Sequence, residues 1–450
     1  MVARAPRTST HAGSPTAAAE NVTAELSAAR DIAAAARDIA EAARQLAETS
    51  SALHRIDSVP APQPTSLPNA TSETRSVQEI LSRFDDETLF AELRRRSLEA
   101  EEAVGSTEEI GSAGESADEP YSLPIPIADL DQMTAFPGNL AALPETVPHP
   151  DDNPPSAAKE ELGKLLYFDR RLSRDNSFSC ASCHNPELGW ADGLPRSRGF
   201  GGIELGRHSP TVINTAFNTV QFWDGRAATL EHQAVGPIMA AGEMNMPSEA
   251  EVLHRITEAP EYENRFESVF GEGVSMDNIG KAIAAFERTV VTGPSPFDRY
   301  MAGDKSALSD AQKRGLVLFM TTASCTACHQ GVNFTDNKFH NLGVRQDGPL
   351  QQDDGRFAVT GDPKDRGAFK TPGLRNIEQS APYMHDGSLA TLQDVVAFYN
   401  KGGERSDNRS TLIQPLNLNG QQQADLVEFL RALTGPLPKV EVPAGSHFRP

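Results

Sequence analysis

The chain contains the pentapeptides Cys180-Ala181-Ser182-Cys183-His184 and Cys325-Thr326-Ala327-Cys328-His329. Both have the form C-x-x-C-H, and together they contain all four cysteines of the sequence. In a chain with 4 Cys and 11 His, even one such copy arises by chance with odds on the order of one in a thousand. The pattern therefore indicates a function that needs both thiols and the histidine.

C-x-x-C-H is the attachment site of c-type haem. The two thiols add to the vinyl groups of one porphyrin, and the histidine that follows becomes the proximal iron ligand. A zinc ribbon fits less well, because its cysteine pairs lie about 15–20 residues apart, whereas Cys183 and Cys325 are 142 positions apart. A redox C-x-x-C site would not need the histidine twice. We therefore predict two covalently bound haem c groups, with His184 and His329 as iron ligands.

Composition limits the remaining possibilities. The 450 residues include 41 Lys and Arg against 62 Asp and Glu, which gives a formal net charge of −21. At about 150 residues per domain, this length allows two or three domains. No stretch approaches the roughly 18 consecutive apolar residues of a transmembrane helix, so we expect no membrane span. The acidic balance also argues against nucleic acid as a partner, because polyphosphate binding needs a basic surface.

The N-terminal part differs in composition from the rest. Ile32, Ile39, Leu46 and Leu53 recur every seven residues in an Ala-rich segment, which predicts a helix with a heptad stripe. Such a stripe could pack against a second copy of itself or against the body of the protein. A lone solvated helix fits the pattern equally well.

Linkers and a second helix are expected before the main body. Residues 58–74 are rich in Pro, Ser and Thr, residues 77–102 form an amphipathic helical pattern, and residues 105–124 are rich in Gly, Ser, Glu and Pro. No secretory signal is recognisable, because no apolar segment follows Arg4 and Arg7.

Helix signals dominate from about residue 125 onward. Ser248 and Ser309 begin capping boxes ahead of apolar-periodic runs. Further helices are predicted over 277–291, 391–400 and 419–433, whereas alternating strand patterns are nearly absent. The sequence therefore predicts a mostly α body with long irregular loops.

The segments around the two haem motifs share further features with a known family. The chain resembles the bacterial dihaem cytochrome c peroxidases, whose scaffold the MauG-type enzymes share, over about residues 125–435. The matching motifs occur in the family's order: Cys180-Ala181-Ser182-Cys183-His184-Asn185-Pro186, Trp223-Asp224-Gly225-Arg226, Glu231-His232-Gln233-Ala234, Glu243-Met244, Arg314-Gly315 through His329, Lys370-Thr371-Pro372-Gly373-Leu374-Arg375-Asn376 and Ala381-Pro382-Tyr383-Met384-His385-Asp386-Gly387.

The resemblance implies two cytochrome-c-like haem domains behind a helical N-terminal extension. We expect the extension and its linkers over residues 1–124, an N-terminal peroxidatic haem domain over 125–300, a C-terminal electron-transfer haem domain over 301–435, and a tail over 436–450.

The resemblance also assigns site residues. Glu243 stands where the family has its acid/base, and Gln233 where that group has its hydrogen-bonding companion. A peroxidase needs a group that moves a proton between the two peroxide oxygens, and a carboxyl in an apolar pocket does this well because desolvation raises its pKa. Taken alone, a Glu is more often a solvated surface group.

Two further positions concern electron transfer. Met384 matches the distal ligand of the C-terminal haem, where a thioether raises the reduction potential. MauG-type enzymes carry tyrosine at that position, and Tyr383 is its neighbour. Trp223 matches the tryptophan between the haems, where an aromatic ring shortens the tunnelling path, although it could also be a packing residue.

Two positions depart from the family pattern. Peroxidases that require reductive activation carry a second histidine 16 positions after the proximal one, which here is Phe200, a residue that cannot bind iron. His208 stands where the family usually has an asparagine that helps to bind calcium between the domains. The activation switch and calcium as a cofactor are therefore both open, and His208 could itself move onto the iron.

The sequence thus predicts reduction of hydrogen peroxide to water at the His184 haem. Electrons would pass through the haem of His329 and Met384 from a small donor such as a cytochrome c or a cupredoxin. The alternatives are MauG-like oxidation of a partner protein and a non-catalytic dihaem electron carrier. The resemblance further implies a periplasmic protein and, since family members are often dimers, a homodimer.

Overall fold

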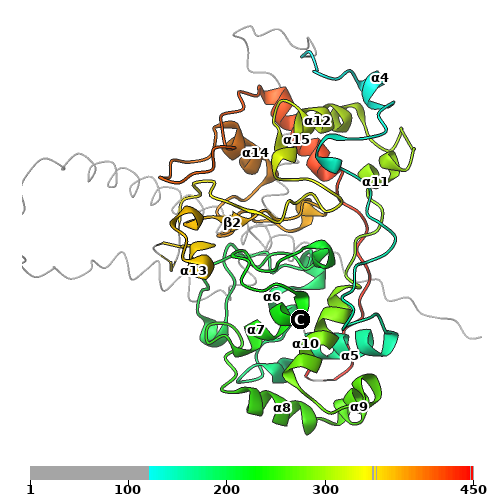
Figure 1. The fold of residues 1–450 in the computed structure, drawn as a ribbon, viewed down its shortest axis with the longest axis vertical. Helices are drawn as coiled ribbons and strands as arrows, with labels where there is room; N and C mark the ends of the chain where they lie inside the picture. The colour runs from blue at the N-terminus through cyan, green and yellow to red at the C-terminus, as the bar shows by residue number, and fades with distance from the viewer. Residues whose placement is uncertain (1–120, 347–348, 351, 446, 449–450) are drawn as a thin grey trace, which may run out of the picture. The chain divides into compact units, whose positions relative to one another are not determined.

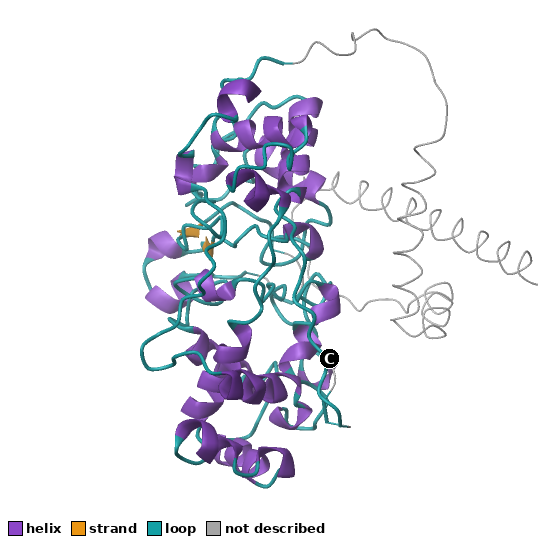
Figure 2. Ribbon diagram, turned by 90° about the vertical axis from the view of Figure 1, so that its right-hand side faces the viewer, coloured by secondary structure: helices purple, strands orange, loops and turns teal. Residues whose placement is uncertain are grey.

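The computed structural model describes residues 121–450, except 347–348, 351, 446 and 449–450. The predicted heptad helix, the second N-terminal helix and most of their linkers lie outside these residues. The described residues belong to one compact unit. Helices connected by long loops make up most of it (Figures 1 and 2), which confirms the mostly α prediction.

The described residues pack around two hydrophobic cores. We call the parts around them the N-terminal half and the C-terminal half. The N-terminal half contains α5 (Ala157–Phe168), α6 (Cys180–Cys183), α7 (Leu230–Met239), α8 (Glu249–Thr257), α9 (Arg265–Phe270) and α10 (Met276–Glu287). The C-terminal half contains α4 (Ile127–Leu130), α11 (Pro296–Met301), α12 (Asp310–Met320), α13 (Phe357–Thr360), α14 (Leu392–Asn400) and α15 (Gly420–Arg431).

Shorter elements complete the described chain. The strands β1 (Phe339–His340) and β2 (Phe369–Lys370) pair antiparallel, with Phe339 opposite Lys370. Single 3-10 turns occur at η1 (Pro137–Asn139), η2 (Arg170–Leu172), η3 (Pro186–Leu188), η4 (Phe200–Gly202), η5 (Thr215–Phe217), η6 (Pro260–Tyr262), η7 (Cys325–Ala327), η8 (Pro363–Asp365) and η9 (Ile377–Gln379).

Local signals account for several helix ends. The Ser248 hydroxyl accepts a hydrogen bond from the Glu251 amide at the start of α8, and Ser309 forms a complete capping box at the start of α12, as the sequence predicts. The helix predicted over 277–291 ends at Glu287 instead. After the C-cap residue Arg288 come three β-branched residues, at positions 289–291, and such residues favour extended backbone.

The two halves are built around the same kind of helix crossing. A Cβ added to Gly163 in α5 would lie 1.8 Å from the carbonyl oxygen of Ala282 in α10. In the C-terminal half, a Cβ on Gly315 in α12 would lie 1.9 Å from the carbonyl oxygen of Asp425 in α15. Only glycine permits backbones this close. Each C-x-x-C-H motif follows the first helix of its crossing pair.

At both ends of the described part, a segment of the chain packs into the core of the half that is farther away in the sequence. Leu130, Phe136 and Leu140 lie within the expected first haem domain, but they are buried in the core of the C-terminal half. The reason is that α4 packs on α12. At the other end, the tail beyond α15 runs back beside α5 and α10 (Figure 1), and Phe448 is buried in the core of the N-terminal half. Both exchanges tie the halves together.

Candidate haem sites and the region between them

The first C-x-x-C-H motif is a single capped helical turn. In α6, Ser179 and Ser182 form a capping box, which fixes the turn that carries Cys180 and Cys183. The carbonyl oxygen of His184 accepts a hydrogen bond of 3.0 Å from the Tyr167 hydroxyl. Burial lowers the pKa of the His184 imidazole, so the ring is neutral at pH 7 and a nitrogen lone pair is available to a metal.

In the second motif, the ring of His329 has a hydrogen-bond partner that fixes its orientation. In η7 and the residues after it, the Nδ1 of His329 lies 2.9 Å from the carbonyl oxygen of Phe334. Because a carbonyl only accepts, Nδ1 is the donor and Nε2 keeps its lone pair. Burial also lowers the pKa of His329. This is the ring geometry that an iron ligand needs.

Both cysteine pairs remain as buried thiols. Burial raises the pKa of Cys183 to about 12, that of Cys325 to about 12 and that of Cys328 to about 11. None of the four cysteines forms a disulfide. Because no disulfide joins them, both thiols of each motif are able to form thioethers.

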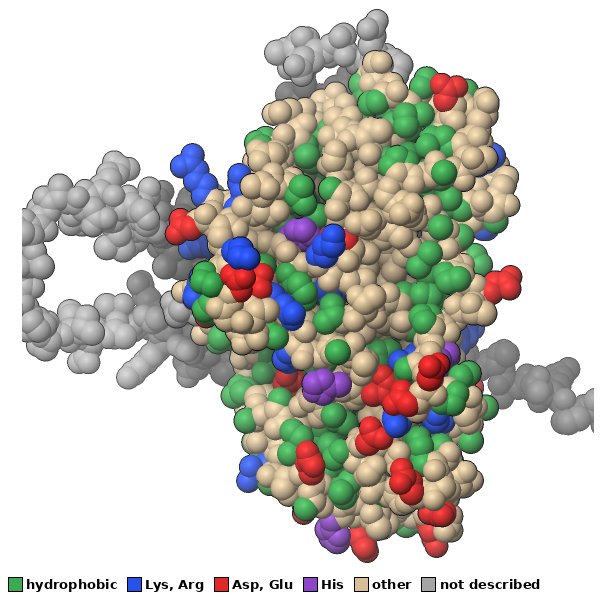
Figure 3. All heavy atoms as spheres, viewed as in Figure 1, with side chains coloured by type: hydrophobic (Ala, Val, Ile, Leu, Met, Phe, Trp, Pro, Cys, Tyr) green, Lys and Arg blue, Asp and Glu red, His purple; other side chains and the backbone are tan. Residues whose placement is uncertain are grey.

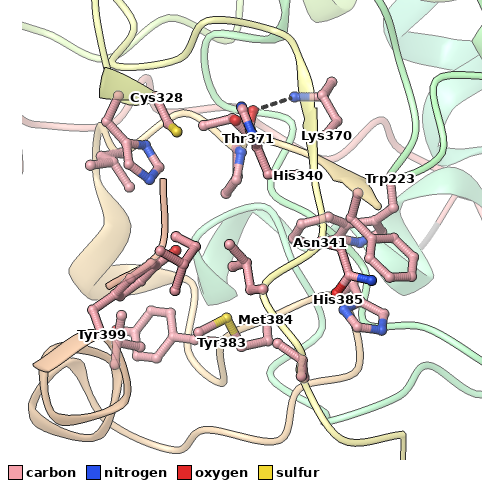
Figure 4. Close-up of a pocket in the computed structure, with 18 of the residues that line it drawn as sticks. Trp223, Cys328, His340, Asn341, Lys370, Thr371, Tyr383, Met384, His385 and Tyr399 are labelled. Atoms are coloured by element: carbon pink, nitrogen blue, oxygen red, sulfur yellow. Dashed lines mark hydrogen bonds between the residues drawn. The ribbon is translucent and has the colours of Figure 1, made fainter. Parts of the chain in front are cut away.

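A cavity of about 750 Å³ lies against the second motif. Cys325, Cys328, His329 and Met384 all line it, and Figure 4 shows Met384 across the cavity from Cys328. A porphyrin attached at both thiols and held between an imidazole and a thioether needs this set of donors around a space of this size. The residues therefore fit haem c.

A strained loop presents Met384. Tyr383 and Leu389 exchange backbone hydrogen bonds of 2.7 and 3.4 Å, which closes the loop between them. Met384 has a φ of 72°, a left-handed backbone conformation that is costly for a non-glycine residue. The neighbouring Tyr383 is buried, and its hydroxyl donates to the carbonyl oxygen of Ile377 at 3.1 Å. Of these two side chains, Met384 is the one free to bind a metal in the cavity.

Glu243 lies near the first motif. Its carboxyl interacts electrostatically with the thiols of Cys180 and Cys183, and burial raises its pKa while the Arg226 guanidinium opposes that rise. The backbone carbonyl of Glu243 accepts a hydrogen bond of 2.9 Å from the amide of Phe200. The structure thus brings Glu243 and Phe200 together on one side of the motif.

Gln233 is half-buried on α7, which starts after Thr229. The Thr229 hydroxyl caps this helix by accepting from the His232 amide at 3.2 Å. Within the described residues, no hydrogen bond of the Gln233 side chain is observed, so its amide is available to another group.

Trp223 and His208 lie between the halves. The Trp223 indole donates to the His208 carbonyl at 2.9 Å, and the His208 amide donates to the His385 carbonyl at 2.8 Å. The His208 ring is 4% exposed, and its Nδ1 lies 2.8 Å from the Leu194 carbonyl oxygen. Trp223 and His208 both line the cavity of the second motif. To bind a metal elsewhere, the His208 ring would have to give up its contact with the Leu194 carbonyl, while two backbone hydrogen bonds restrain the residue.

Several residues of this region were not predicted. His385 stacks on Phe369 with 3.6 Å between ring centroids, and Arg207 forms ion pairs of 2.7 Å with Asp224 and 2.6 Å with Asp353. The Met-His-Asp-Gly motif contains His385, but nothing in the sequence indicates that its ring stacks. The partners of Arg207 are 17 and 146 positions away, and no local pattern identifies them.

Asp336 and His340 lie beside Cys328. The Nε2 of His340 is 3.0 Å from an Asp336 carboxylate oxygen, and ligand atoms of all three residues lie within 4.8 Å of one another. Because Cys328 is the expected thioether residue, Asp336 and His340 are neighbours of the haem rather than a separate metal site.

Charge is unevenly distributed over the face shown in Figure 3. Acidic side chains gather over the N-terminal half around α8 and α9, whereas Lys and Arg gather near α13 and β2. In the described part of the chain, no helix is long and apolar enough to cross a bilayer.

Comparison with known proteins places these features in one family. A profile of the family described as di-haem cytochrome c peroxidase matches residues 157–306. The methylamine utilization protein MauG of Methylorubrum extorquens is 44% identical over 313 residues, which cover 68% of this chain and 88% of that protein. The cytochrome c551 peroxidase of Pseudomonas aeruginosa is 39% identical over 332 residues, covering 72% of this chain and 92% of that protein.

Two solved structures of similar proteins resemble this chain in fold. A MauG-like protein associated with microbial copper homeostasis is 34% identical with a TM-score of 0.60, covering 65% of this chain and 95% of that one. The diheme peroxidase BthA from Burkholderia thailandensis is 25% identical with a TM-score of 0.55, covering 67% and 91%. Together with the two C-x-x-C-H motifs, these matches show that the chain belongs to the di-haem cytochrome c peroxidase family and is an enzyme that uses haem c.

Proposed function

We propose that the enzyme reduces hydrogen peroxide to water at the haem held by His184. Electrons would come from a small redox protein by way of the haem held by His329 and Met384. The observation that carries this proposal is Glu243, a buried carboxyl with a raised pKa beside the first haem motif. The overall reaction consumes one peroxide, two electrons and two protons and yields two water molecules.

In this proposal Cys180 and Cys183 hold one haem covalently, and Cys325 and Cys328 hold the other. When bound, haem c supplies an iron that binds peroxide in one site and exchanges electrons in the other. The domain limits proposed are 125–300 and 301–435, with residues 127–140 belonging structurally to the C-terminal half.

Glu243 acts as the proton carrier. Its carboxylate accepts the proton of the peroxide oxygen nearer the iron and returns that proton to the departing oxygen. A pKa near the working pH allows both transfers, and burial raises the pKa of Glu243 in that direction. Arg226 favours the charged form and so keeps the carboxyl able to accept. Gln233 donates from its free amide to hold the peroxide or the carboxylate in place.

Phe200 stands where a second histidine ligand would be, so position 200 would supply no ligand to a haem iron held by His184. Its amide is hydrogen-bonded to the Glu243 carbonyl, and its side chain has no atom that binds iron. The His208 ring is held by the Leu194 carbonyl, and the His208 backbone is bonded to Trp223 and His385. The oxidised enzyme should therefore react with peroxide without prior reduction.

Trp223 carries electrons between the sites. It lines the cavity of the second motif, and its backbone carbonyl accepts a hydrogen bond of 2.7 Å from the Lys370 amide in β2. The backbone of Trp223 is thus hydrogen-bonded to the C-terminal half, whereas its indole donates to the His208 carbonyl of the N-terminal half.

The electron donor and the cellular compartment are inferred from the family resemblance. Arg345, Arg366 and Arg405 line the cavity of the second motif, which supports a cytochrome c or cupredoxin with an acidic docking face. A periplasmic location and a homodimer are proposed on the resemblance alone.

MauG-like oxidation of a partner protein is the second candidate. The 44% identity to a MauG protein favours it. Against it, Met384 replaces the tyrosine ligand of that branch, and the hydroxyl of the adjacent Tyr383 is hydrogen-bonded to Ile377.

The test is Glu243→Gln, with Glu204→Gln as the matched control in an exposed neighbouring loop. Glu243→Gln should retain two haems and the resting spectrum but lose peroxide turnover by about 10²-fold or more, the scale of a lost general acid/base. Glu204→Gln should keep wild-type turnover. Turnover of Glu243→Gln within a factor of two of wild type contradicts the assigned role. Oxidation of a partner protein without donor-linked peroxide reduction would favour the second candidate.

A further inference from the structure

Arg207 forms an ion pair with both halves of the molecule. Its Nε and Nη2 atoms donate to the two carboxylate oxygens of Asp353 at 2.6 and 2.8 Å, and its Nη1 atom donates to Asp224 at 2.7 Å. Asp224 belongs to the N-terminal half and Asp353 to the C-terminal half. Their side chains are only 8% and 4% exposed. One guanidinium therefore joins two buried carboxylates that come from different halves.

The guanidinium charge keeps both carboxylates ionised. Burial alone would raise the pKa of Asp224 and of Asp353, but the hydrogen bonds and the charge of Arg207 lower both pKa values below the ordinary one. Arg226 adds to this lowering at Asp224, and the Gly355 amide adds to it at Asp353. Removing the cation from such an arrangement leaves buried charge without compensation, which is costly.

The residues that adjoin this ion pair also hold Trp223. Arg207 is followed by His208, whose carbonyl oxygen accepts the Trp223 indole N–H at 2.9 Å, and Trp223 is followed by Asp224. Two consecutive residues thus bind two other consecutive residues. Because the ion pair lies one residue from the indole hydrogen bond on both segments, it limits how far the indole can move.

Aromatic contacts connect Arg207 with Trp223 by a second route. The Arg207 guanidinium lies 5.5 Å from the centroid of the Phe369 ring, and Phe369 stacks on His385. The Trp223 ring meets the His385 ring edge-on, with 6.4 Å between centroids (Figure 4). Phe369, His385 and Trp223 line the cavity of the second motif. Arg207 therefore fixes Trp223 relative to the wall of that cavity.

We propose that Arg207 is a positioning residue that holds the Trp223 indole in place for electron transfer between the two haems. The proposal rests on the proposed function, because it requires Trp223 to be the relay. Arg207 itself carries no electron and acts through Asp224 and His208. Since electron tunnelling weakens steeply with distance, a small displacement of the indole slows the transfer.

The experiment compares the holoenzyme with Arg207→Gln and with Arg171→Gln as the matched control. Arg171 pairs with Asp169 at 2.7 Å and with Glu261 at 2.9 Å, and it also lies over an aromatic ring. Both carboxylates belong to the N-terminal half. Each change thus removes a guanidinium from two carboxylates and a ring, but of the two only Arg207 joins the halves beside Trp223.

The first readout is the rate of electron transfer between the haems after laser photolysis of carbon monoxide. Carbon monoxide keeps the N-terminal haem ferrous while the C-terminal haem is ferric, and its release lets the electron move. The second readout is the deuterium uptake of residues 220–227 by mass spectrometry. The midpoint potentials of both haems are measured as well, so that a change in driving force is separated from a change in position. None of these readouts depends on peroxide turnover.

Arg207→Gln should slow the electron transfer by about tenfold or more, because a misplacement of ~1 Å can already cost a positioned site about 10²-fold. It should also raise the deuterium uptake around Trp223. Arg207→Lys, which keeps the charge but not the planar fork of donors, should have a smaller effect of the same kind. Arg171→Gln should match wild type in both readouts. In a Trp223→Phe background, Arg207→Gln should slow the transfer no further.

Two results would overturn the proposal while Trp223 remains the relay. One is a wild-type transfer rate in Arg207→Gln, and the other is an equal loss when Arg207→Gln is added to Trp223→Phe. If Arg207→Gln does not fold with two haems, the same comparisons are made with Arg207→Lys. A wild-type rate in Trp223→Phe alone has a different meaning, because Trp223 is then not the relay and that step of the proposed function fails together with the role of Arg207.

Discussion

Replacing Glu287 by Gln should make the stability of the N-terminal half less dependent on pH. Glu287 is the last residue of α10 and is 5% exposed, and its Oε2 has no hydrogen-bond partner among the described residues. Burial raises its pKa to about 8, Glu231 adds to that rise, and Arg288 opposes it. The carboxyl also faces Tyr167 and Cys180, whose pKa values it helps to raise.

The magnitude follows from the two protonation equilibria. Below pH 4.5, the ordinary pKa of the group, the carboxyl is protonated in both the folded and the unfolded chain. As pH rises toward about 8, the unfolded chain releases a proton that the folded chain retains, so the free energy of unfolding falls. At 1.36 kcal/mol per pKa unit, the gap between 4.5 and about 8 corresponds to roughly 5 kcal/mol as an upper bound. A glutamine of the same shape does not titrate and avoids this loss.

Denaturant unfolding of the holoenzyme measures the effect. Trp190 is fully buried against Phe286, with 6.1 Å between ring centroids, so its fluorescence reports this core. Between about pH 5 and about pH 9, the stability of Glu287→Gln relative to wild type should rise by up to roughly 4 kcal/mol. Glu258→Gln, an exposed change in the same half, should follow the wild-type profile. Parallel profiles for Glu287→Gln and wild type would refute the reasoning.

Three further changes test other parts of the two sites. Replacing Cys325 and Cys328 by Ala should lower the covalent haem content from two to one by pyridine haemochrome titration, and haem that extracts into acid butanone from the wild type would contradict covalent attachment. Met384→His should keep the C-terminal haem six-coordinate but lower its potential, because imidazole stabilises ferric iron better than thioether does; an unchanged potential would exclude Met384 as a ligand. Ferric wild-type enzyme should react with peroxide in stopped flow without pre-reduction, and His208→Ala should react at the same rate. A wholly low-spin resting protein that reacts only after reduction would refute the open-iron prediction.

Much of the fold could be predicted because its signals are local. A capping serine and the residue three positions later are hydrogen-bonded within one turn, so Ser248 and Ser309 identify helix starts without any tertiary information. The C-x-x-C-H motifs are equally local, since both thiols and the histidine serve one porphyrin. The family resemblance then placed Glu243 and Met384 near motifs from which they are distant in sequence.

The remaining features depend on contacts that no local pattern encodes. Glu287 lies in an ordinary amphipathic helix, and only the packing of α10 against α5 buries it. The burial of Leu130 and Phe448 in opposite cores likewise follows from the path of the chain between the halves.

Trp223, the proposed relay residue, is held by hydrogen bonds from both halves. Trp223 is fixed at its indole nitrogen by a carbonyl of its own half, but its backbone carbonyl is fixed by the Lys370 amide of the other half. His208 links the two, because its amide binds the carbonyl of His385, the residue that follows Met384. A movement of the Met384 loop would therefore be transmitted through one backbone hydrogen bond to the residue that orients Trp223. If Trp223 relays electrons and Met384 binds the second iron, as proposed, the orientation of the relay residue is coupled to the ligation of that iron.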